Sequence, residues 1–540
     1  MTSDTISALL AQRRADSCDR ECLVADEQRM TYGQLEEQSE RFARQLLAAG
    51  VSFGTRIGIL LPNRPEFVVS WTAIARIGAV AVPISTLSTP AELRRICRHA
   101  NLHLLVSSPT YLHHSFVDLI AIALGGLDHE RPPYRLAALP RLRSVWMWGE
   151  GVPGWSEPID LDVEPDIGAE VLAAVECDVT AGDVVSIIYT SGSTADPKGV
   201  IHTHGSLMRA ARKCRDTYDQ RADDRLFTQM PFFWVGGLTV NLLAAMSAGA
   251  TQLTCSSSAA SEVLEFLERE HATSVTAWPH LARSIAADPT FSVRDLSSVR
   301  MGGLHEALPP SARPIDPTLM NSALGMTETA GPHTVASLAE LPEERRGSFG
   351  PAQPGMAHRV VDPATGRPVA AAEVGELLVR GDTLMAGLVR RERHETFDDD
   401  GWYRTGDLVS IRDGHLHFHG RLDDLIKTAG ANVSPREVEE VLTRLPGVLA
   451  AIVTSVDGGE RGDVVGAVLV VSDPGLDIGA LRAAAKRELS SYKVPRVIVI
   501  LGPDEVPLMA SGKVNRLALI ERLRRREGAV LTVAPRDARD

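Results

Sequence analysis

The amino-acid sequence predicts an α/β protein with a large N-terminal domain of parallel sheets and a small α+β domain at the C-terminus. A chain of 540 residues is longer than one hydrophobic core normally supports, so we expect two or more domains. Helical and strand patterns alternate before residue 345. After that point the composition shifts towards glycine, proline and residues that favour β-structure.

Pairs of a helical pattern and a strand pattern recur along the N-terminal part. These segments are, in chain order, 31–51 and 56–62, 66–78 and 79–85, and 261–272 and 274–279. Such alternation indicates parallel strands joined by crossover helices, and therefore layered, mostly parallel sheets.

The C-terminal part divides at a charged stretch. Residues 345–420 are rich in turn residues and strand formers, which predicts a β subdomain. From residue 422, short strands alternate with helices in a block of the size of an independent domain. We therefore expect a large domain at 1–421 and a small one at 422–540.

Composition and charge exclude several classes of protein. The chain has 56 basic and 69 acidic residues and a net charge of −13, which disfavours non-specific binding to nucleic acid or to an anionic membrane. We find neither a signal-peptide core nor an apolar run near the ~18 residues of a membrane span. The six cysteines lack zinc-site spacing, so we expect free thiols and a soluble, cytoplasmic protein.

The segment 187–206, IIYTSGSTADPKGVIHTHGS, contains the strongest chemical signal. It follows a predicted strand at 184–189 and precedes a predicted helix at 206–218. The loop between them offers Thr190, Ser191, Gly192, Ser193, Thr194, Lys198 and Gly199. Hydroxyls, exposed backbone N–H groups and one lysine suit a polyphosphate, whereas an ordinary Ser/Gly surface loop is the alternative.

This segment resembles the signature loop of the adenylate-forming superfamily of acyl-CoA synthetases, peptide-synthetase adenylation domains and beetle luciferase. The family pattern is met, except that Ala195 stands where glycine is usual. Further similar motifs follow in the family's order along nearly the whole chain, among them GILLPNRPEF, GSFGPAQPG, DGWYRTGDL and VPLMASGKVNR. The chain is most similar to actinobacterial acyl-CoA ligases for lipid or natural-product acids.

The resemblance implies an enzyme that activates a carboxylic acid with ATP and Mg2+ as an acyl-adenylate and then transfers the acyl group to CoA. It implies that Lys513 bridges the carboxylate and the α-phosphate. The glutamate of the pair Thr327–Glu328, together with Thr194, would hold Mg2+. Asp407 would accept from the ribose hydroxyls, with Arg421 beside it.

The resemblance also implies the other nucleotide contacts and a mobile C-terminal domain. The remaining ATP or AMP positions are Thr190, Ser191, Gly192, Ser193, Thr194, Lys198, Gly303, Leu304, Leu324, Gly325 and Met326. In the family the small domain rotates after adenylation, and Asp423 matches the hinge. Lys427 and Gly430 then match the CoA tunnel, where glycine lets the pantetheine pass close to the backbone. The nucleophile is the thiol of CoA, so no nucleophilic side chain is required.

The sequence shows four departures from the family pattern. Trp234 replaces a histidine, Leu304–His305 replace Ala-Pro, Leu324 replaces the aromatic residue that stacks on adenine, and Ala195 replaces a glycine. These changes either adjust substrate specificity or weaken adenylation. The second interpretation follows from Ala195–Asp196, because an acidic residue in the loop would oppose the grip on pyrophosphate.

The predicted acyl pocket is almost wholly apolar. By resemblance it is lined by Phe232, Trp234, Gly237, Met301, Gly302, Leu304 and Ala323. We therefore expect an apolar acid, and a bulky cyclic or terpenoid one in particular. The alternatives are a ligase that receives acyl-adenylate from a separate adenylating enzyme, and an acyl-AMP ligase that loads a separate carrier protein. The expected partners are the acid and CoA, with an adenylating ligase or acyltransferase of the same pathway, in a monomer or homodimer.

Overall fold

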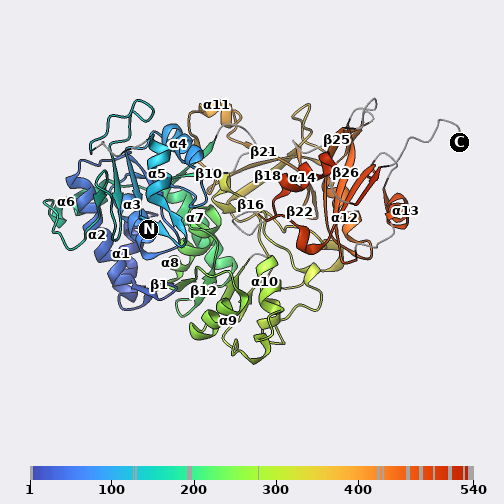
Figure 1. Ribbon diagram of the computed structural model, residues 1–540, viewed down its shortest axis with the longest axis horizontal. Coiled ribbons are helices and arrows are strands. Elements are labelled where there is room, and N and C mark those ends of the chain that lie inside the picture. The colour runs from blue at the N-terminus through green and yellow to red at the C-terminus, as the bar shows by residue number, and fades with distance from the viewer. Residues whose placement is uncertain are drawn as a thin grey trace. The chain divides into compact units, whose positions relative to one another are not determined.

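The computed structural model describes residues 4–125, 127, 131–190, 197–277, 279–337, 339–422, 426–428, 431–433, 435–457, 463–473, 478–489, 493–508, 514–526 and 529–532. The chain forms two compact units (Figure 1). The first unit is Met1–Ala357 with Arg380–Tyr403, and the second is His358–Val379 with Arg404–Asp540.

The larger sheet of the first unit has eight strands. Their order is β20 (Gly387–Leu388), β11 (Lys198–Thr203), β10 (Val184–Thr190), β4 (Val80–Pro83), β3 (Arg56–Leu60), β5 (Leu104–Ser107), β8 (Ser144–Met147) and β9 (Glu157–Pro158). Pairing is parallel from β10 to β9 and antiparallel at β10–β11 and β11–β20.

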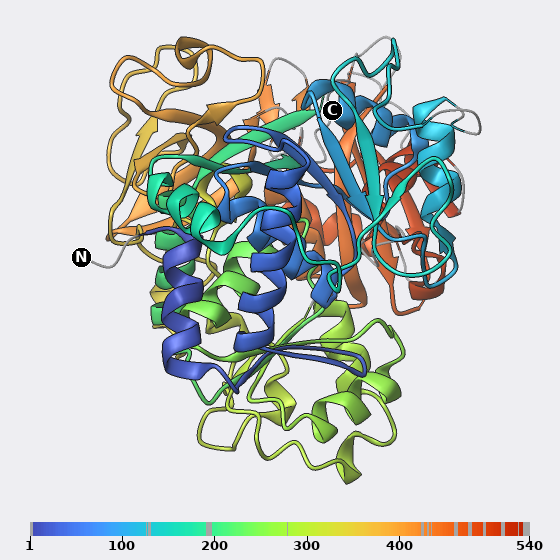
Figure 2. The same cartoon turned by 90° about the vertical axis from the view of Figure 1, so that its left-hand side faces the viewer.

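A second sheet of six strands belongs to the same unit. Its order is β15 (Met301–Gly302), β14 (Ser274–Thr276), β12 (Arg225–Thr228), β13 (Thr251–Thr254), β1 (Glu21–Ala25) and β2 (Gln28–Thr31). Only β1 and β2 pair antiparallel, and Figure 2 shows this blue hairpin beside the green strands. The two sheets confirm the predicted layered, mostly parallel architecture.

The helices of the first unit connect and cover these strands. They are α1 (Ile6–Ser17), α2 (Tyr32–Ala48), α3 (Pro65–Arg76), α4 (Pro90–His99), α5 (Phe116–Leu124), α6 (Ala169–Asp178), α7 (His204–Thr217), the π-helix η1 (Gly236–Leu243), α8 (Ala244–Ala248), α9 (Ala260–Arg269), α10 (Pro279–Ala286) and α11 (Arg393–Thr396). Local sequence sets their starts. Thr31 and Gln34 form a capping box on α2, and Pro65 occupies the first turn of α3, where a missing N–H costs nothing.

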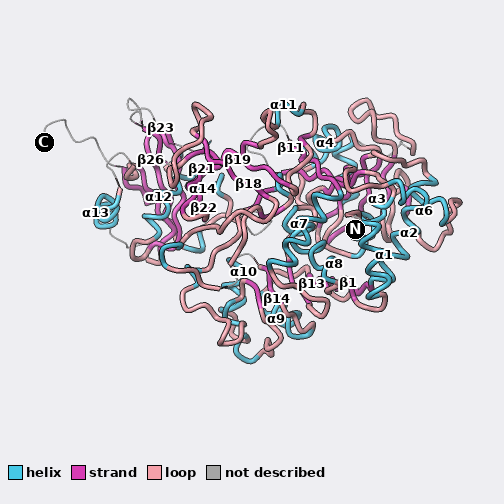
Figure 3. Tube along the Cα trace, turned by 180° about the vertical axis from the view of Figure 1, so that it is seen from behind, coloured by secondary structure: helices cyan, strands magenta, loops and turns pink. Residues whose placement is uncertain are grey.

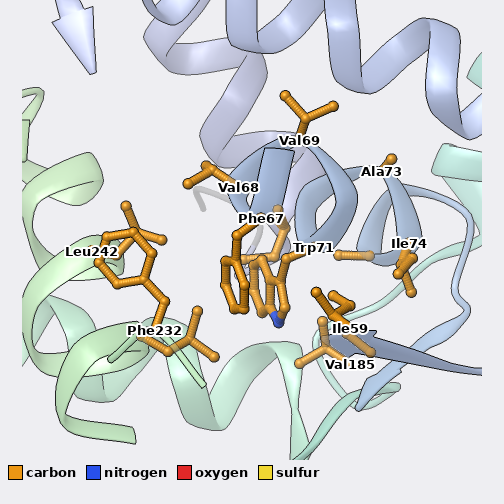
Figure 4. Close-up of a cluster of buried hydrophobic side chains, with 14 of the residues drawn as sticks. Ile59, Phe67, Val68, Val69, Trp71, Ala73, Ile74, Val185, Phe232 and Leu242 are labelled. Atoms are coloured by element: carbon orange, nitrogen blue, oxygen red, sulfur yellow. The ribbon is translucent and has the colours of Figure 1, made fainter. Parts of the chain in front are cut away.

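The main hydrophobic core of this unit surrounds α3. Phe67 and Trp71 of α3 are buried in it, and it includes side chains from β1 and β2 as well as from β3 and β4. Figure 4 shows these two rings with Phe232 and Leu242 on one side and Ile59 and Val185 on the other. The core therefore joins both sheets, and α1, α2 and α3 pack against one another within it.

The second unit contains two four-stranded sheets and a two-stranded one. The first sheet has the order β18 (Met356–Val361), β19 (Gly375–Gly381), β21 (Tyr403–Arg412) and β22 (His415–Arg421), whose strands are magenta in Figure 3. The others are β23 (Ile426–Thr428) with β24 (Ala431–Val433), and β25 (Val448–Asp457), β26 (Asp463–Val471), β27 (Val497–Leu501) and β28 (Ala529–Thr532). Helices α12 (Pro435–Thr443), α13 (Ile478–Glu488) and α14 (Arg516–Arg525) accompany them.

Most predicted elements are confirmed, with one addition at the proposed phosphate loop. The expected helix after the loop is α7, but the strand β11 intervenes between loop and helix. Its residues KGVIHT continue the sheet because Val200 is buried and the main chain pairs with β10. The division at residue 421 stays a prediction, and the hinge position Asp423 lies outside the described residues.

Two further expectations concern cysteines and membranes. All six cysteines fall within the described part and are free thiols, as predicted. Among the described helices, none combines the length and the apolar character that crossing a bilayer requires.

A buried histidine ties the first helix to α7. The Ile6 amide, at the start of α1, donates to Nδ1 of His204 at 3.3 Å. Burial lowers the pKa of His204 to about 4, from an ordinary value of 6.5, while the Asp183 charge opposes this shift. The side chain is therefore neutral in the native protein at pH 7 and acts as an acceptor.

We expect His204 to make the protein acid-sensitive. Because the unfolded chain binds this proton more readily, stability is complete above pH 6.5 and falls towards pH 4, by at most about 1.4 kcal/mol per pH unit. His204→Asn keeps an acceptor but cannot titrate. The free energy of unfolding, measured with urea from pH 4 to pH 7, should therefore depend less steeply on pH in this variant than in wild type. His113→Asn, at an exposed position, is the control. Equal slopes in wild type and His204→Asn would contradict this interpretation.

Candidate active site

The proposed phosphate loop is closed by the antiparallel strands β10 and β11. Thr190 and Lys198 are partners in this ladder, so the two ends of the loop lie opposite each other. Gly199 lies directly after Lys198, and a Cβ there would be 2.9 Å from Cζ of Tyr189 and 3.0 Å from Cγ2 of Val389. Glycine thus permits close packing at the base of the loop. The predicted residues Ser191, Gly192, Ser193 and Thr194 lie outside the described residues.

Lys198, Glu328 and Tyr403 form one polar network. The Lys198 ammonium forms an ion pair with the Glu328 carboxylate and donates to the Tyr403 hydroxyl at 2.7 Å. The Tyr403 hydroxyl in turn donates to Oε1 of Glu328 at 3.2 Å. Glu328 is 5% exposed and Tyr403 7%, so the carboxylate is largely withdrawn from water. A buried carboxylate needs such compensation.

A strained turn presents Glu328. The hairpin of β16 (Gly325–Met326) and β17 (Gly331–Pro332) encloses a short 3-10 helix, Thr327–Thr329, and Ala330 has φ of 58°. The Thr329 hydroxyl donates to the Gly331 carbonyl at 2.6 Å. A Cβ on Gly325 would lie 2.8 Å from the Gly331 backbone, so glycine is required there. The Met385 amide also donates to the Glu328 carbonyl at 2.7 Å, which fixes the main chain from a second side.

A second buried histidine lies beside this turn. His202 of β11 is fully buried, and burial lowers its pKa to about 4. The Thr327 backbone and the Glu328 charge oppose that shift, which places the ring near both. Neutral His202 thus adds no competing positive charge beside Glu328.

The predicted acyl-pocket residues differ in exposure. Phe232 is fully buried and Gly237 is buried in η1, whereas Trp234 is partly exposed and packs edge-on against Phe233 at 5.1 Å. Ala323 is half-buried as well. Trp234 is therefore the one large side chain among these four residues that is partly exposed.

The segment after β14 places its residues in two environments. Gly302 is exposed with φ of 114°, and a Cβ there would lie 2.2 Å from the Val275 carbonyl oxygen. Gly303 is also exposed and Met301 half-buried. Leu304, by contrast, is 1% exposed and packs in a core cluster with Val275. The bulky side chain is thus accommodated by burial away from the exposed glycines.

The positions predicted to contact adenine lie at the start of the hairpin that presents Glu328. Leu324 and Met326 are half-buried and Gly325 is exposed. The Leu324 amide donates to the Thr334 hydroxyl at 2.7 Å, and its carbonyl accepts from the His333 amide at 2.9 Å. These bonds fix the main chain, whatever the side chain at 324 contacts.

In the second unit, Asp407 and Arg421 form an ion pair. Nη1 of Arg421 donates to Oδ1 of Asp407 at 2.7 Å, and the two residues are partners in the β21–β22 ladder. Asp407 is 7% exposed, and its amide donates to the Thr405 hydroxyl at 3.0 Å. Gly406, with φ of 73°, lies within β21 directly before Asp407.

Other predicted residues remain predictions. Asp423, Gly430 and Lys513 lie outside the described residues. Lys427 is in β23, opposite Asn432 of β24. Within the described residues, no cluster of three or more potential metal ligands occurs.

Tyr403 and His202 were not predicted from the sequence. The only available signal for Tyr403 was its place in the motif DGWYRTGDL, four residues before Asp407. His202 lies in the segment 187–206 but had no predicted role, and its burial depends on contacts that are distant in sequence.

Comparison with protein families gives two matches. The family described as AMP-binding enzyme matches residues 10–389. The AMP-binding enzyme C-terminal domain matches residues 437–513.

Curated relatives and solved structures agree with these matches. A feruloyl-CoA synthase of Amycolatopsis sp. is 32% identical over 90% of this chain and 92% of its own. A 3-[(3aS,4S,7aS)-7a-methyl-1,5-dioxo-octahydro-1H-inden-4-yl]propanoyl:CoA ligase of Mycobacterium tuberculosis is 30% identical over 96% and 98%. The structure of the anthranilate CoA ligase AuaEII with anthranoyl-AMP has a TM-score of 0.77 and 25% identity, covering 97% of this chain and 98% of that one.

The ion pair of Lys198 and Glu328 predicts strong coupling between the two side chains. Lys198→Met leaves a buried carboxylate without its cation and should lower stability more in wild type than in a Glu328→Gln background. We expect a coupling energy of about 1–3 kcal/mol from urea unfolding of the four proteins. Additive effects of the two substitutions would contradict the pairing.

Proposed function

Since the chain belongs to the AMP-binding enzyme family, we propose that it converts a bulky, cyclic and apolar carboxylic acid into its CoA thioester. The chain is an acyl-CoA ligase that acts through an acyl-adenylate, with ATP and CoA as co-substrates. The identity of the acid and the roles of single residues are the proposed part.

The reaction has two half-reactions. The carboxylate oxygen attacks the α-phosphorus of ATP, a P–O bond forms, and pyrophosphate leaves. The thiol sulfur of CoA then attacks the acyl carbonyl of the adenylate, its proton is lost, and AMP leaves. The first step brings anions together and therefore needs fixed cationic groups near the phosphates.

The main support for ATP-dependent adenylation by this protein is the network of Lys198, Glu328 and Tyr403. Lys198 comes shortly after the proposed phosphate loop, and its ammonium would stabilise the negative charge that develops on the leaving pyrophosphate. Its side chain is 31% exposed, whereas that of Glu328 is 6% exposed, so the lysine side chain is partly accessible while its partner is buried. A ligase that only used a ready-made adenylate would not need this cation.

The same network fits a magnesium ion. Mg2+ is normally held by one or two carboxylates together with substrate phosphates, and Glu328 supplies such a carboxylate. When bound, the ion would neutralise phosphate charge during adenylation. Tyr403 donates to Glu328 independently of Lys198, so the carboxylate keeps a fixed orientation if Lys198 turns towards phosphate.

The acid class is supported by the pocket residues and by the relatives. None of the seven predicted pocket residues carries a charge, and partly exposed Trp234 offers an aromatic surface for a ring. Three relatives are named for cyclic acids, namely ferulate, a bicyclic propanoate and anthranilate. A sulfoacetate–CoA ligase is nevertheless 29% identical, so overall similarity alone does not select the acid.

The remaining roles are proposals by resemblance. Asp407 would accept from the ribose hydroxyls, with Arg421 fixing its carboxylate. Lys513 would join carboxylate and α-phosphate, and rotation about Asp423 would then bring Lys427 and Gly430 to CoA.

The alternative is a ligase that uses an adenylate made elsewhere, because Ala195 and Asp196 depart from the family loop. The retained Lys198–Glu328 pair weighs against it. Transfer to a carrier protein instead of CoA is the further alternative.

A panel of acids tests the function. With ATP, Mg2+ and CoA, we expect kcat/KM for cyclic apolar acids to exceed that for acetate by at least about tenfold, because each apolar group buried in the pocket favours the larger acid. Thioester formation is measured by mass spectrometry. Glu328→Gln should reduce the ATP-dependent rate by about 10²–10³-fold.

Two outcomes would contradict the proposal. A preference for acetate would exclude the proposed acid class. Thioester formation from synthetic acyl-AMP but from no acid plus ATP would identify the enzyme as specialised for the second half-reaction.

A further inference from the structure

We propose that Asn63 is a positioning residue that sets acid selectivity by fixing the loop that carries Trp234. The inference rests on the proposed function, because it concerns which acids are converted to thioesters. Asn63 lies between β3 and α3, far in sequence from the loop, and belongs to none of the site positions discussed above.

The Asn63 side chain clamps the loop main chain at two points. Its Nδ2 donates to the Met230 carbonyl at 2.9 Å, and its Oδ1 accepts from the Phe232 amide at 2.7 Å. Both ends of one amide are therefore used on residues two apart in the same loop. This geometry fixes the direction of the peptide groups on both sides of Pro231.

An apolar contact from the same region holds the loop a second time. Phe67, four residues after Asn63, packs against Phe232 with ring centroids 5.7 Å apart, and both rings are fully buried (Figure 4). The segment 63–67 thus contributes a hydrogen-bonded and a hydrophobic anchor. Both anchors act on the residues directly before Trp234.

The position of Trp234 follows from these anchors. Its amide donates to the Pro231 carbonyl at 3.1 Å, and its carbonyl accepts from the Leu238 amide at 2.8 Å. A Cβ on Gly237 would lie 2.1 Å from the Pro231 carbonyl oxygen, so the π-helix η1 rests against the clamped peptide. The peptide groups that Asn63 holds are therefore in direct contact with the main chain of Trp234 and η1.

Small shifts at Trp234 matter because indole is the largest side chain in the predicted acid pocket. Selectivity between two acids depends on the difference in transition-state binding, and a displacement of about 1 Å can alter rates up to 100-fold. Asn63 would therefore affect selectivity without touching the acid. Its action should pass through Trp234.

Two substitutions at Asn63 test this inference. Asn63→Ala removes both hydrogen bonds. Asn63→Asp keeps the acceptor for the Phe232 amide but turns a carboxylate oxygen towards the Met230 carbonyl. We expect either change to alter the ratio of kcat/KM for a bicyclic acid to that for a small linear acid by at least about fivefold, with the KM for ATP changed less than about twofold.

The matched control is Ser107→Ala. The Ser107 hydroxyl is buried and donates to the Leu60 carbonyl of β3 at 3.1 Å, so this variant loses a buried hydrogen bond beside the same strand. It should lower the melting temperature, as Asn63→Ala does, but leave the selectivity ratio unchanged. Each ratio is then measured again in a Trp234→Ala background, where Asn63→Ala should change it less than about twofold.

The outcomes separate this inference from the proposed function. An unchanged ratio in both Asn63 variants, or an equal shift in the Trp234→Ala background, would overturn the inference and leave the ligase activity intact. Failure of the wild-type protein to form any thioester would overturn the proposed function and this inference together.

Discussion

The buried charge of Glu328 is the constraint from which the architecture of the site follows. A carboxylate that is 5% exposed is stable only beside a cation and fixed donors, and Lys198 and Tyr403 provide these. Lys198 can do so because β11, which begins at Lys198 and pairs with β10, lies beside the Glu328 hairpin. That hairpin depends in turn on glycine at 325 and on the left-handed Ala330. One ion pair thus links the strand after the proposed phosphate loop to the Glu328 hairpin.

The predicted acid side of the enzyme is organised by a different kind of contact. Its loop is held by main-chain hydrogen bonds to Asn63 and by packing on Phe67, both from the segment that opens α3. Here a polar residue fixes the main chain, and apolar side chains are predicted to line the pocket. Such a division would let a predicted pocket side chain such as Trp234 vary without loss of the loop position.

The sequence predicts much of the N-terminal fold correctly because the helical and strand periodicities are strong in that part of the chain. The segments 31–51 and 66–78 become α2 and α3, and the adjoining runs become β3 and β4. The motif residues Lys198 and Glu328 are also recognisable, since their chemistry is tied to fixed neighbours in the chain. Strand β11 is harder to predict, because it follows a segment rich in turn-forming residues and is defined by its pairing with β10. Tyr403, His202 and Asn63 have no periodic signal, and their roles depend on contacts more than 100 residues away.

The decisive measurement is a single-turnover reaction of the wild-type protein with ATP, Mg2+ and a cyclic apolar acid in the absence of CoA. Bound products are identified by mass spectrometry after rapid quenching. If Lys198 and Glu328 support adenylation, acyl-AMP accumulates in a stoichiometric amount with release of pyrophosphate, and Glu328→Gln suppresses it. Absence of acyl-AMP from a protein that still converts synthetic acyl-AMP into thioester would contradict this role of the ion pair.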